Sequence, residues 1–226
     1  MDTRHVQDHF EEEALEYDRA ILRLVPFYHE QHEIILRLLP FERKSPLQII
    51  DLGCGTGLLS HAVLKAFPLA KLVAWDLTAN MLETCKQNLA PYLDRASFRQ
   101  GDFGKDDIGL GYDLVVSGFA IHHLDNAGKQ SLYRRIFHAL NSGGVFINKE
   151  IVLGASPALT KCYEQWWHEF VKANGEDDNA WFRKYVEEDI PASAEDQLVW
   201  LTQAGFVDVG CHWRYFNFAI FGGRKP

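Results

Sequence analysis

The sequence predicts an α/β fold built around a mostly parallel sheet. Short apolar runs rich in β-branched residues alternate with segments of helical periodicity, which is typical of buried parallel strands connected by helices. The first of these runs, 48–52, leads directly into a glycine-rich turn. The last two, 207–213 and 215–222, follow each other closely and predict an antiparallel hairpin. The length of 226 residues suits one large domain.

The glycine-rich turn is the most informative stretch of the chain. Glycines occupy alternate positions at Gly53, Gly55 and Gly57, and helical spacing begins at Leu58. Glycine lets the backbone turn sharply and approach a ligand without a Cβ in the way. The spacing is not the G-x-G-x-x-G of dinucleotide sites, because the last glycine comes one residue early, and no Lys-Ser/Thr pair marks a P-loop. A strand, this turn and a helix start predict a nucleotide-type crevice.

Acidic residues come at or just after the ends of the first three predicted strands. Asp51 lies in the first strand, Asp76 ends the second at 71–76, and Asp102 follows the third. Asp76 stands about 20 residues beyond the glycine turn, where a carboxylate can accept hydrogen bonds from both ribose hydroxyls. Asp76 as an acid at a helix start, and Gly101-Asp102 as an ordinary turn, are the simpler alternatives.

The pattern Asp51-x-Gly53-x-Gly55-x-Gly57 resembles motif I of the class I S-adenosylmethionine (SAM) dependent methyltransferases. The turn His122-His123-Leu124 resembles that of the small-molecule enzymes of this family that are related to ubiquinone and menaquinone biosynthesis. The resemblance covers 47–224. It implies a Rossmann-like seven-stranded sheet in the order 3-2-1-4-5-7-6, with strand 7 antiparallel and helices on both faces. It also implies SAM as cofactor and S-adenosylhomocysteine (SAH) as product.

The same resemblance implies which residues bind the cofactor. The motif I acid and glycine turn would hold the amino-acid end, the acid after the second strand the ribose, and the acid after the third strand the adenine amine. Cys54 is also interpreted as a small side chain tolerated in the turn, and a nucleophilic thiol is the alternative. The complete cofactor set is Asp51, Gly53, Cys54, Gly55, Gly57, Asp76, Leu77, Met81, Asp102, Phe103, Ser117 and Tyr17.

The acceptor side of the site is less defined. His122 and His123 follow the fourth strand, and histidine is the side chain best suited to take a proton near neutral pH. One of them packing on the cofactor and the other bonding to backbone is the alternative. Lys149, at the end of the fifth strand, is a candidate substrate contact, with an ion pair to Glu150 as the alternative. Arg183 is a second candidate substrate contact, on the basis of a resemblance to the carboxy-SAM synthases.

Three reactions remain open. The first is methyl transfer from SAM to an unidentified small molecule. The second follows from a resemblance to carboxy-SAM synthases, which act on SAM itself and in which an arginine in the region of Arg183 pairs with the extra carboxylate. Gly55-Thr56 departs from the Ser-Leu pair of that family. The third is a catalytically silent SAM- or SAH-binding regulatory protein.

Segment boundaries, charge and cysteine content indicate the domain organisation and the expected partners. We expect 1–45 to form an N-terminal helical lid and 46–226 the SAM-binding domain, with a helical insertion at 155–203 before strand 6. The net charge is −8 without a basic run, so a nucleic-acid partner is not expected. No run reaches the roughly 18 apolar residues of a membrane span. Four scattered cysteines predict reduced thiols and a cytoplasmic location.

No metal is expected either. His29 and His32 have helical spacing, but the sequence shows no further ligands for a metal ion. The expected partner is a small-molecule substrate, and the sequence leaves a homodimer open.

Overall fold

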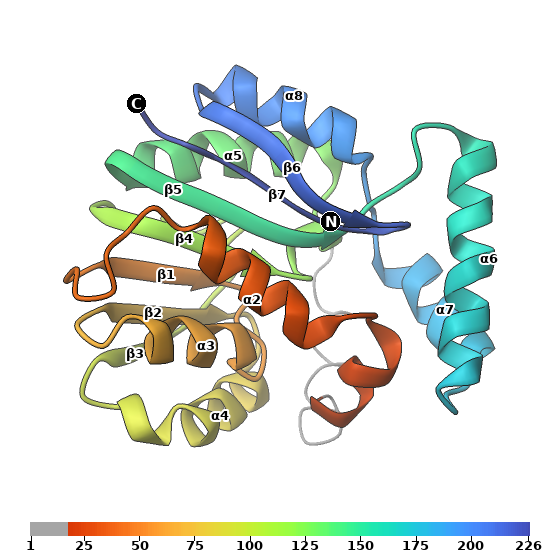
Figure 1. Ribbon diagram of the computed structural model, residues 1–226, viewed down its shortest axis with the longest axis horizontal. Coiled ribbons are helices and arrows are strands. Elements are labelled where there is room, and N and C mark those ends of the chain that lie inside the picture. The colour runs from red at the N-terminus through yellow and green to blue at the C-terminus, as the bar shows by residue number, and fades with distance from the viewer. Residues whose placement is uncertain (1–17) are drawn as a thin grey trace.

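A computed structural model describes residues 18–226 and contains one seven-stranded sheet (Figure 1). Its strand order, β3-β2-β1-β4-β5-β7-β6, is the predicted one. Strands β1 to β5 are parallel, and β7 runs antiparallel to both β5 and β6. The strands are β1 (Gln48–Leu52), β2 (Lys71–Asp76), β3 (Ala96–Gln100), β4 (Tyr112–Gly118), β5 (Leu140–Ile151), β6 (Val207–Tyr215) and β7 (Phe218–Arg224).

Helices cover both faces of the sheet, and Figure 1 shows α2 crossing in front of it. The α-helices are α2 (Tyr28–Leu38), α3 (Leu58–Ala66), α4 (Ala79–Asn88), α5 (Asn126–Ala139), α6 (Pro157–Ala173), α7 (Asp178–Glu188) and α8 (Ala194–Ala204). Two short 3₁₀ helices are η1 (Ala90–Tyr92) and η2 (Ile121–His123). One apolar core lies between the sheet and α5 with α8, and the other between the sheet and α2, α3 and α4. Because side chains alternate along a strand, Phe146 of β5 packs into the first core and Ile147 into the second.

Helices α6 and α7 stand beyond the end of the sheet where β5 finishes (Figure 1). Trp167 and Tyr185 of these helices form a third apolar cluster with Ile151, Phe218 and Leu24. The indole nitrogen of Trp167 donates a hydrogen bond of 2.9 Å to the Leu24 carbonyl. This cluster fixes α6 and α7 as a wall at the carboxyl ends of the parallel strands.

Two elements differ from the sequence-based expectation. Residues 141–144, expected as a turn, belong to β5 and form an irregularity within it, because Leu140 already pairs with Tyr112 and Val145 pairs with Leu114. Helix α8 lies within the predicted insertion, but its Leu201 and Ala194 join the core with α5. Of the helices within the predicted insertion, α6 and α7 therefore pack in the third apolar cluster and not in the two cores that flank the sheet.

Within residues 18–226, no helix combines the length and apolar character that crossing a membrane would need. All four cysteines are free thiols. The sulfur atoms of Cys54 and Cys85 lie 3.9 Å apart and are buried.

Candidate functional site

The glycine turn has a backbone that other residues would adopt only with strain. Gly53, Gly55 and Gly57 have φ values of +70°, +53° and +84°. A Cβ at Gly53 would lie 2.2 Å from the Cβ of Ala120, so the turn also needs the missing side chain. The amides of Gly53 and Cys54 donate to the carbonyl of Trp75 at 2.8 and 3.0 Å. These bonds hold the turn against the end of β2.

The three predicted carboxylates line one cavity together with this turn. Asp76 Oδ2 accepts a 2.8 Å hydrogen bond from the Gly55 amide, and its Oδ1 accepts one of 3.0 Å from the Thr78 amide. Asp51 Oδ2 accepts from the Ser60 hydroxyl at 2.6 Å. Among the residues that the structure describes, Asp51 Oδ1 has no hydrogen-bond partner. A buried, unpartnered acceptor in a cavity fits a ligand that brings an N–H donor, as an α-ammonium group does.

Burial also changes the ionisation of these acids. It raises the pKa of Asp51 to about 6, although Ser60 and Lys149 act in the opposite direction. Burial likewise raises the pKa of Asp76, against the hydrogen bonds from Thr78 and Gly55. Desolvation penalises the charged form of a carboxyl group, and a nearby cation reverses that penalty. The pair of acids therefore favours a ligand with positive charge at this end of the cavity.

The cavity extends in both directions from the glycine turn. At one end Leu77, Met81 and Phe103 form apolar walls beside Asp102, which suits a flat heterocycle with an exocyclic amine. At the other end are aromatic and charged side chains from α2, β5 and the loop after β4. Lining residues that sequence reasoning did not assign to the site are Tyr28, Thr56, Leu58, Leu59, Thr78, Gly118, Phe119, Ala120, Leu124, Glu187 and Glu188.

Some predicted site residues lie outside this lining. Gly57 precedes α3, and an added Cβ there would lie 2.6 Å from Cys85 Sγ. Gly57 therefore allows α3 and α4 to pack closely and does not line the cavity. The Ser117 hydroxyl donates to the Leu52 carbonyl at 2.7 Å and ties β4 to β1. Arg183 is exposed on α7 and does not line the cavity. Tyr17 lies outside the described residues.

The residue after Tyr17 does reach the site. Asp18 accepts hydrogen bonds from the Thr56 hydroxyl and, at 3.0 Å, from the Asn88 amide. Asn88 also donates to the Thr56 carbonyl at 3.0 Å. The segment before α2 is thus bonded to the glycine turn.

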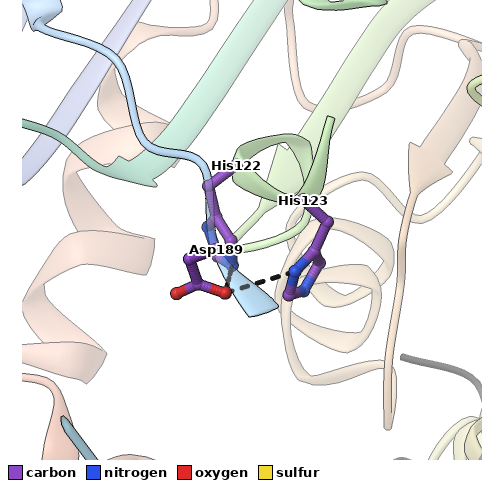
Figure 2. Close-up of side chains that lie close together, drawn as sticks. All are labelled: His122, His123 and Asp189. Carbon is purple, nitrogen blue, oxygen red and sulfur yellow. Dashed lines mark ion pairs between the residues drawn. The ribbon is translucent and has the colours of Figure 1, made fainter. Parts of the chain in front are cut away.

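A cluster of His122, His123 and Asp189 lies beside the cavity (Figure 2). His122 Nδ1 is hydrogen-bonded to Glu150, and its Nε2 lies 3.5 Å from Asp189 Oδ1. His123 Nδ1 lies 3.2 Å from the same oxygen, and His123 also lines the cavity. Asp189 directly follows α7, so the cluster joins the wall of the cavity to η2 and β5.

The two carboxylates decide the protonation of His122. Burial lowers the pKa of His122, but the charges of Asp189 and Glu150 together outweigh burial and raise it to about 9. Burial also acts to raise the pKa of Asp189, and the neighbouring histidines hold it below its ordinary value. His122 is therefore an imidazolium at neutral pH, and His123 is the histidine that faces the cavity.

The same cluster offers a set of donors to a metal ion. The ligating atoms of His122, His123 and Asp189 all lie within 4.8 Å of one another, and the bond to Glu150 orients His122 as in many metal sites. A divalent ion there would have to displace the proton of His122. His29 and His32 do not form such a set, because His32 contacts Lys149 instead.

Comparisons with known proteins agree with this geometry. The family described as "Methyltransferase domain" matches residues 50–146. A carboxy-S-adenosyl-L-methionine synthase from Nautilia profundicola is 26% identical over 93% of this chain and 91% of its own length. One from Campylobacter jejuni subsp. doylei is 27% identical over 91% of this chain and 88% of its own length.

Solved structures show the same fold at lower identity. An O-methyltransferase family protein from Burkholderia thailandensis has a TM-score of 0.68 at 16% identity, over all of this chain and 60% of its own. Human N-acetylserotonin methyltransferase in complex with SAM has a TM-score of 0.64 at 21% identity, over 95% of this chain and 56% of its own. The chain thus spans only somewhat more than half the length of these two structures.

A Rossmann-like sheet with a glycine turn and three acids along one cavity defines an adenosyl-binding α/β enzyme class. The matched domain, the sheet order and the related sequences make the chain similar to the class I SAM-dependent methyltransferases.

Proposed function

We propose that the protein transfers a methyl group from SAM to a small molecule bound at the Phe119 and Lys149 end of the cavity. The observation that supports this most strongly is the set of three carboxylates, at the ends of β1, β2 and β3, that line one cavity with the glycine turn. No single one of these acids would be specific. Together they match a ligand with an ammonium group, a ribose diol and an adenine amine in sequence.

The residues of the chain contribute mainly binding and orientation. SAM supplies a methyl group that its sulfonium charge already activates. Asp51 receives the ammonium group, and Asp76 receives the ribose hydroxyls. Leu77, Met81 and Phe103 pack around the adenine and exclude water. Holding an acceptor in line with the methyl–sulfur bond contributes several kcal/mol without further chemistry.

An acceptor hydroxyl or amine would also need to lose a proton. His123 lines the cavity, and Asp189 lies against its Nδ1 and orients the ring. His122 is less suited to this role, because it already holds a proton between two carboxylates. We therefore assign the general base to His123 and a positioning role to His122.

Calorimetry with SAM and SAH tests the cofactor part of the proposal. We expect Asp76→Ala to weaken both ligands by about tenfold or more, because it removes a charged acceptor of two hydrogen bonds. Asp94→Ala is the matched control, since Asp94 is exposed and lies outside the cavity lining. Equal affinity of both variants for SAH would contradict the assignment.

Screening small acids, phenols and amines for SAH release then tests transfer. We expect at least one acceptor class to turn over and His123→Ala to slow it while SAH affinity is kept. SAM binding without turnover on any acceptor would instead favour the silent regulatory protein.

A second candidate function is carboxy-SAM synthesis. The curated relatives that carry this name match the chain over about nine tenths of its length. The exposed position of Arg183 weighs against it, because the guanidinium does not line the cavity to meet an extra carboxylate. Mass spectrometry of the ligand that copurifies with the protein separates the two candidates, since carboxy-SAM is heavier than SAM by one CO₂ unit.

A further inference from the structure

Strand β5 places a lysine head group inside the cavity, with almost no access to solvent. Lys149 is 1% exposed, and its Nζ lies 3.8 Å from the ring centroid of Tyr28 and 4.8 Å from that of Phe119. Its side chain passes Gly118, where an added Cβ would be 2.6 Å from Lys149 Cε. The missing side chain at Gly118 therefore leaves the room that the lysine occupies.

The partner of this lysine is neutral. Lys149 Nζ lies 2.7 Å from His32 Nε2. Burial lowers the pKa of His32 to about 2, with a further contribution from Lys149, so His32 accepts a hydrogen bond and carries no charge. The neighbouring Glu150 does not form an ion pair with Lys149, which was the alternative interpretation, because alternation along β5 turns it to the opposite face, toward His122.

Lys149 consequently has no ion pair with any carboxylate of residues 18–226, although Asp51 acts on it electrostatically. A buried ammonium group without a paired anion is costly for a folded protein. Two of its surfaces are already covered, by His32 and by the aromatic rings. The remaining surface faces the cavity, where a ligand can supply the missing negative charge.

We propose that Lys149 and His32 form a binding site for a carboxylate group of a ligand, next to the methyl-donor end of the cavity. This inference rests on the proposed function, because it assumes SAM in the cavity. A sulfonium and an ammonium group repel each other in a site with little water, and a carboxylate between them offsets that repulsion. Both the methionyl carboxylate of SAM and the carboxylate of an acid acceptor have this chemistry.

We also expect Lys149 to take up a proton when a carboxylate ligand binds at neutral to alkaline pH. Burial lowers the pKa of Lys149 to about 7, so in the empty protein the lysine loses its proton above that pH. A bound carboxylate stabilises the charged form, so affinity should fall by up to about tenfold per pH unit above pH 7. The groups facing Lys149 are His32 and Tyr28 of α2 and Asp51 of β1. The pKa values of His32, about 2, and Asp51, about 6, lie below this range.

Calorimetry with the full chain tests the site and separates the two sources. SAM and decarboxylated SAM differ only in the carboxylate. If Lys149 binds the cofactor, Lys149→Met should weaken SAM about tenfold or more, remove its pH dependence and leave decarboxylated SAM unchanged. If it binds the acceptor, both cofactors keep their affinity, and carboxylic acids but not their amides should bind the SAH-loaded protein in a Lys149-dependent way.

Lys65→Met is the matched control, since Lys65 is exposed on α3 outside this cavity. Lys149→Gln keeps a donor and serves as the second variant should Lys149→Met not fold. The proposal is overturned if the Lys149 variants bind SAM like the wild type, with the same pH dependence, and if acids and amides behave alike. Failure of the wild-type protein to bind SAM or SAH at all would instead refute the proposed function.

Discussion

The proton on His122 is a stability element at the scale of a single residue. The pKa of His122 is raised from 6.5 to about 9 in the folded protein, because Asp189 and Glu150 outweigh the effect of burial. The stability that this proton contributes is fully present below pH 6.5. It is lost as the pH rises through about 9, and it amounts to about 3 kcal/mol.

Urea denaturation between pH 6 and pH 9.5 measures this contribution. We expect the unfolding free energy of the wild type to decrease across the alkaline part of that range, and His122→Gln to remove most of the decrease. His138→Gln is the control, because His138 is exposed at the end of α5. A His122→Gln protein with the same pH slope as the wild type would show that the imidazolium does not hold the wall.

Sequence reasoning reached some residues of the site and not others. Asp51 and Asp76 were predictable, because their place at strand ends fixes where their carboxylates lie. The partners of Lys149 and His122 were not, since His32 and Asp189 are distant in the sequence and only tertiary packing brings them close. Arg183 came from resemblance alone, and the structure places it on the surface.

At the scale of the element, the glycine turn makes a sharp prediction. Gly53→Ala brings a Cβ to 2.2 Å from Ala120 at a φ of +70°, so overlap and backbone strain add. We expect a loss of about 3 kcal/mol or more in unfolding free energy, together with weaker SAH binding. Urea denaturation and calorimetry measure the two effects.

Gly143→Ala measures how much of the loss in unfolding free energy comes from backbone strain alone. Gly143 has a φ of +79°, and an added Cβ would meet nothing within 4 Å. We expect this variant to lose only about 1 kcal/mol and to keep its SAH affinity. Similar losses in the two variants would mean that the contact with Ala120 is not what requires glycine in the turn.

The elements themselves were largely predictable from periodicity. The strand order and the antiparallel β7 are confirmed. The start of β5 was missed because Asn141-Ser142-Gly143-Gly144 has turn composition, whereas pairing of Leu140 with Tyr112 extends the strand. The placement of α8 with α5 likewise depends on tertiary packing that helical spacing does not encode.

At the scale of the whole molecule, the cavity joins parts that are far apart in the chain. Its lining comes from α2, the ends of the parallel strands and the end of α7. A ligand that contacts all of them binds the folded state only. SAH at 100 times its Kd should therefore stabilise the protein by about 2.7 kcal/mol.

For a chain of this length, that stabilisation corresponds to a rise in Tm of roughly 5–10 °C. A thermal melt with increasing SAH measures it, and Asp76→Ala should need far more SAH for the same shift. An unchanged wild-type Tm at saturating SAH would argue that the ligand does not bridge the parts of the fold.

Two neighbouring residues of strand β5 place charged side chains on opposite faces of the sheet. The side chain of Lys149 lines the cavity on one face of the sheet, and the side chain of Glu150 is hydrogen-bonded to His122 on the other face. A slip of one residue in one direction would set the carboxylate of Glu150 beside Asp51, and a slip in the other direction would set the ammonium group of Lys149 beside His122 and Lys129. Either slip would bring like charges together on one face, so electrostatic repulsion disfavours misalignment of this strand in both directions, in addition to its apolar side chains.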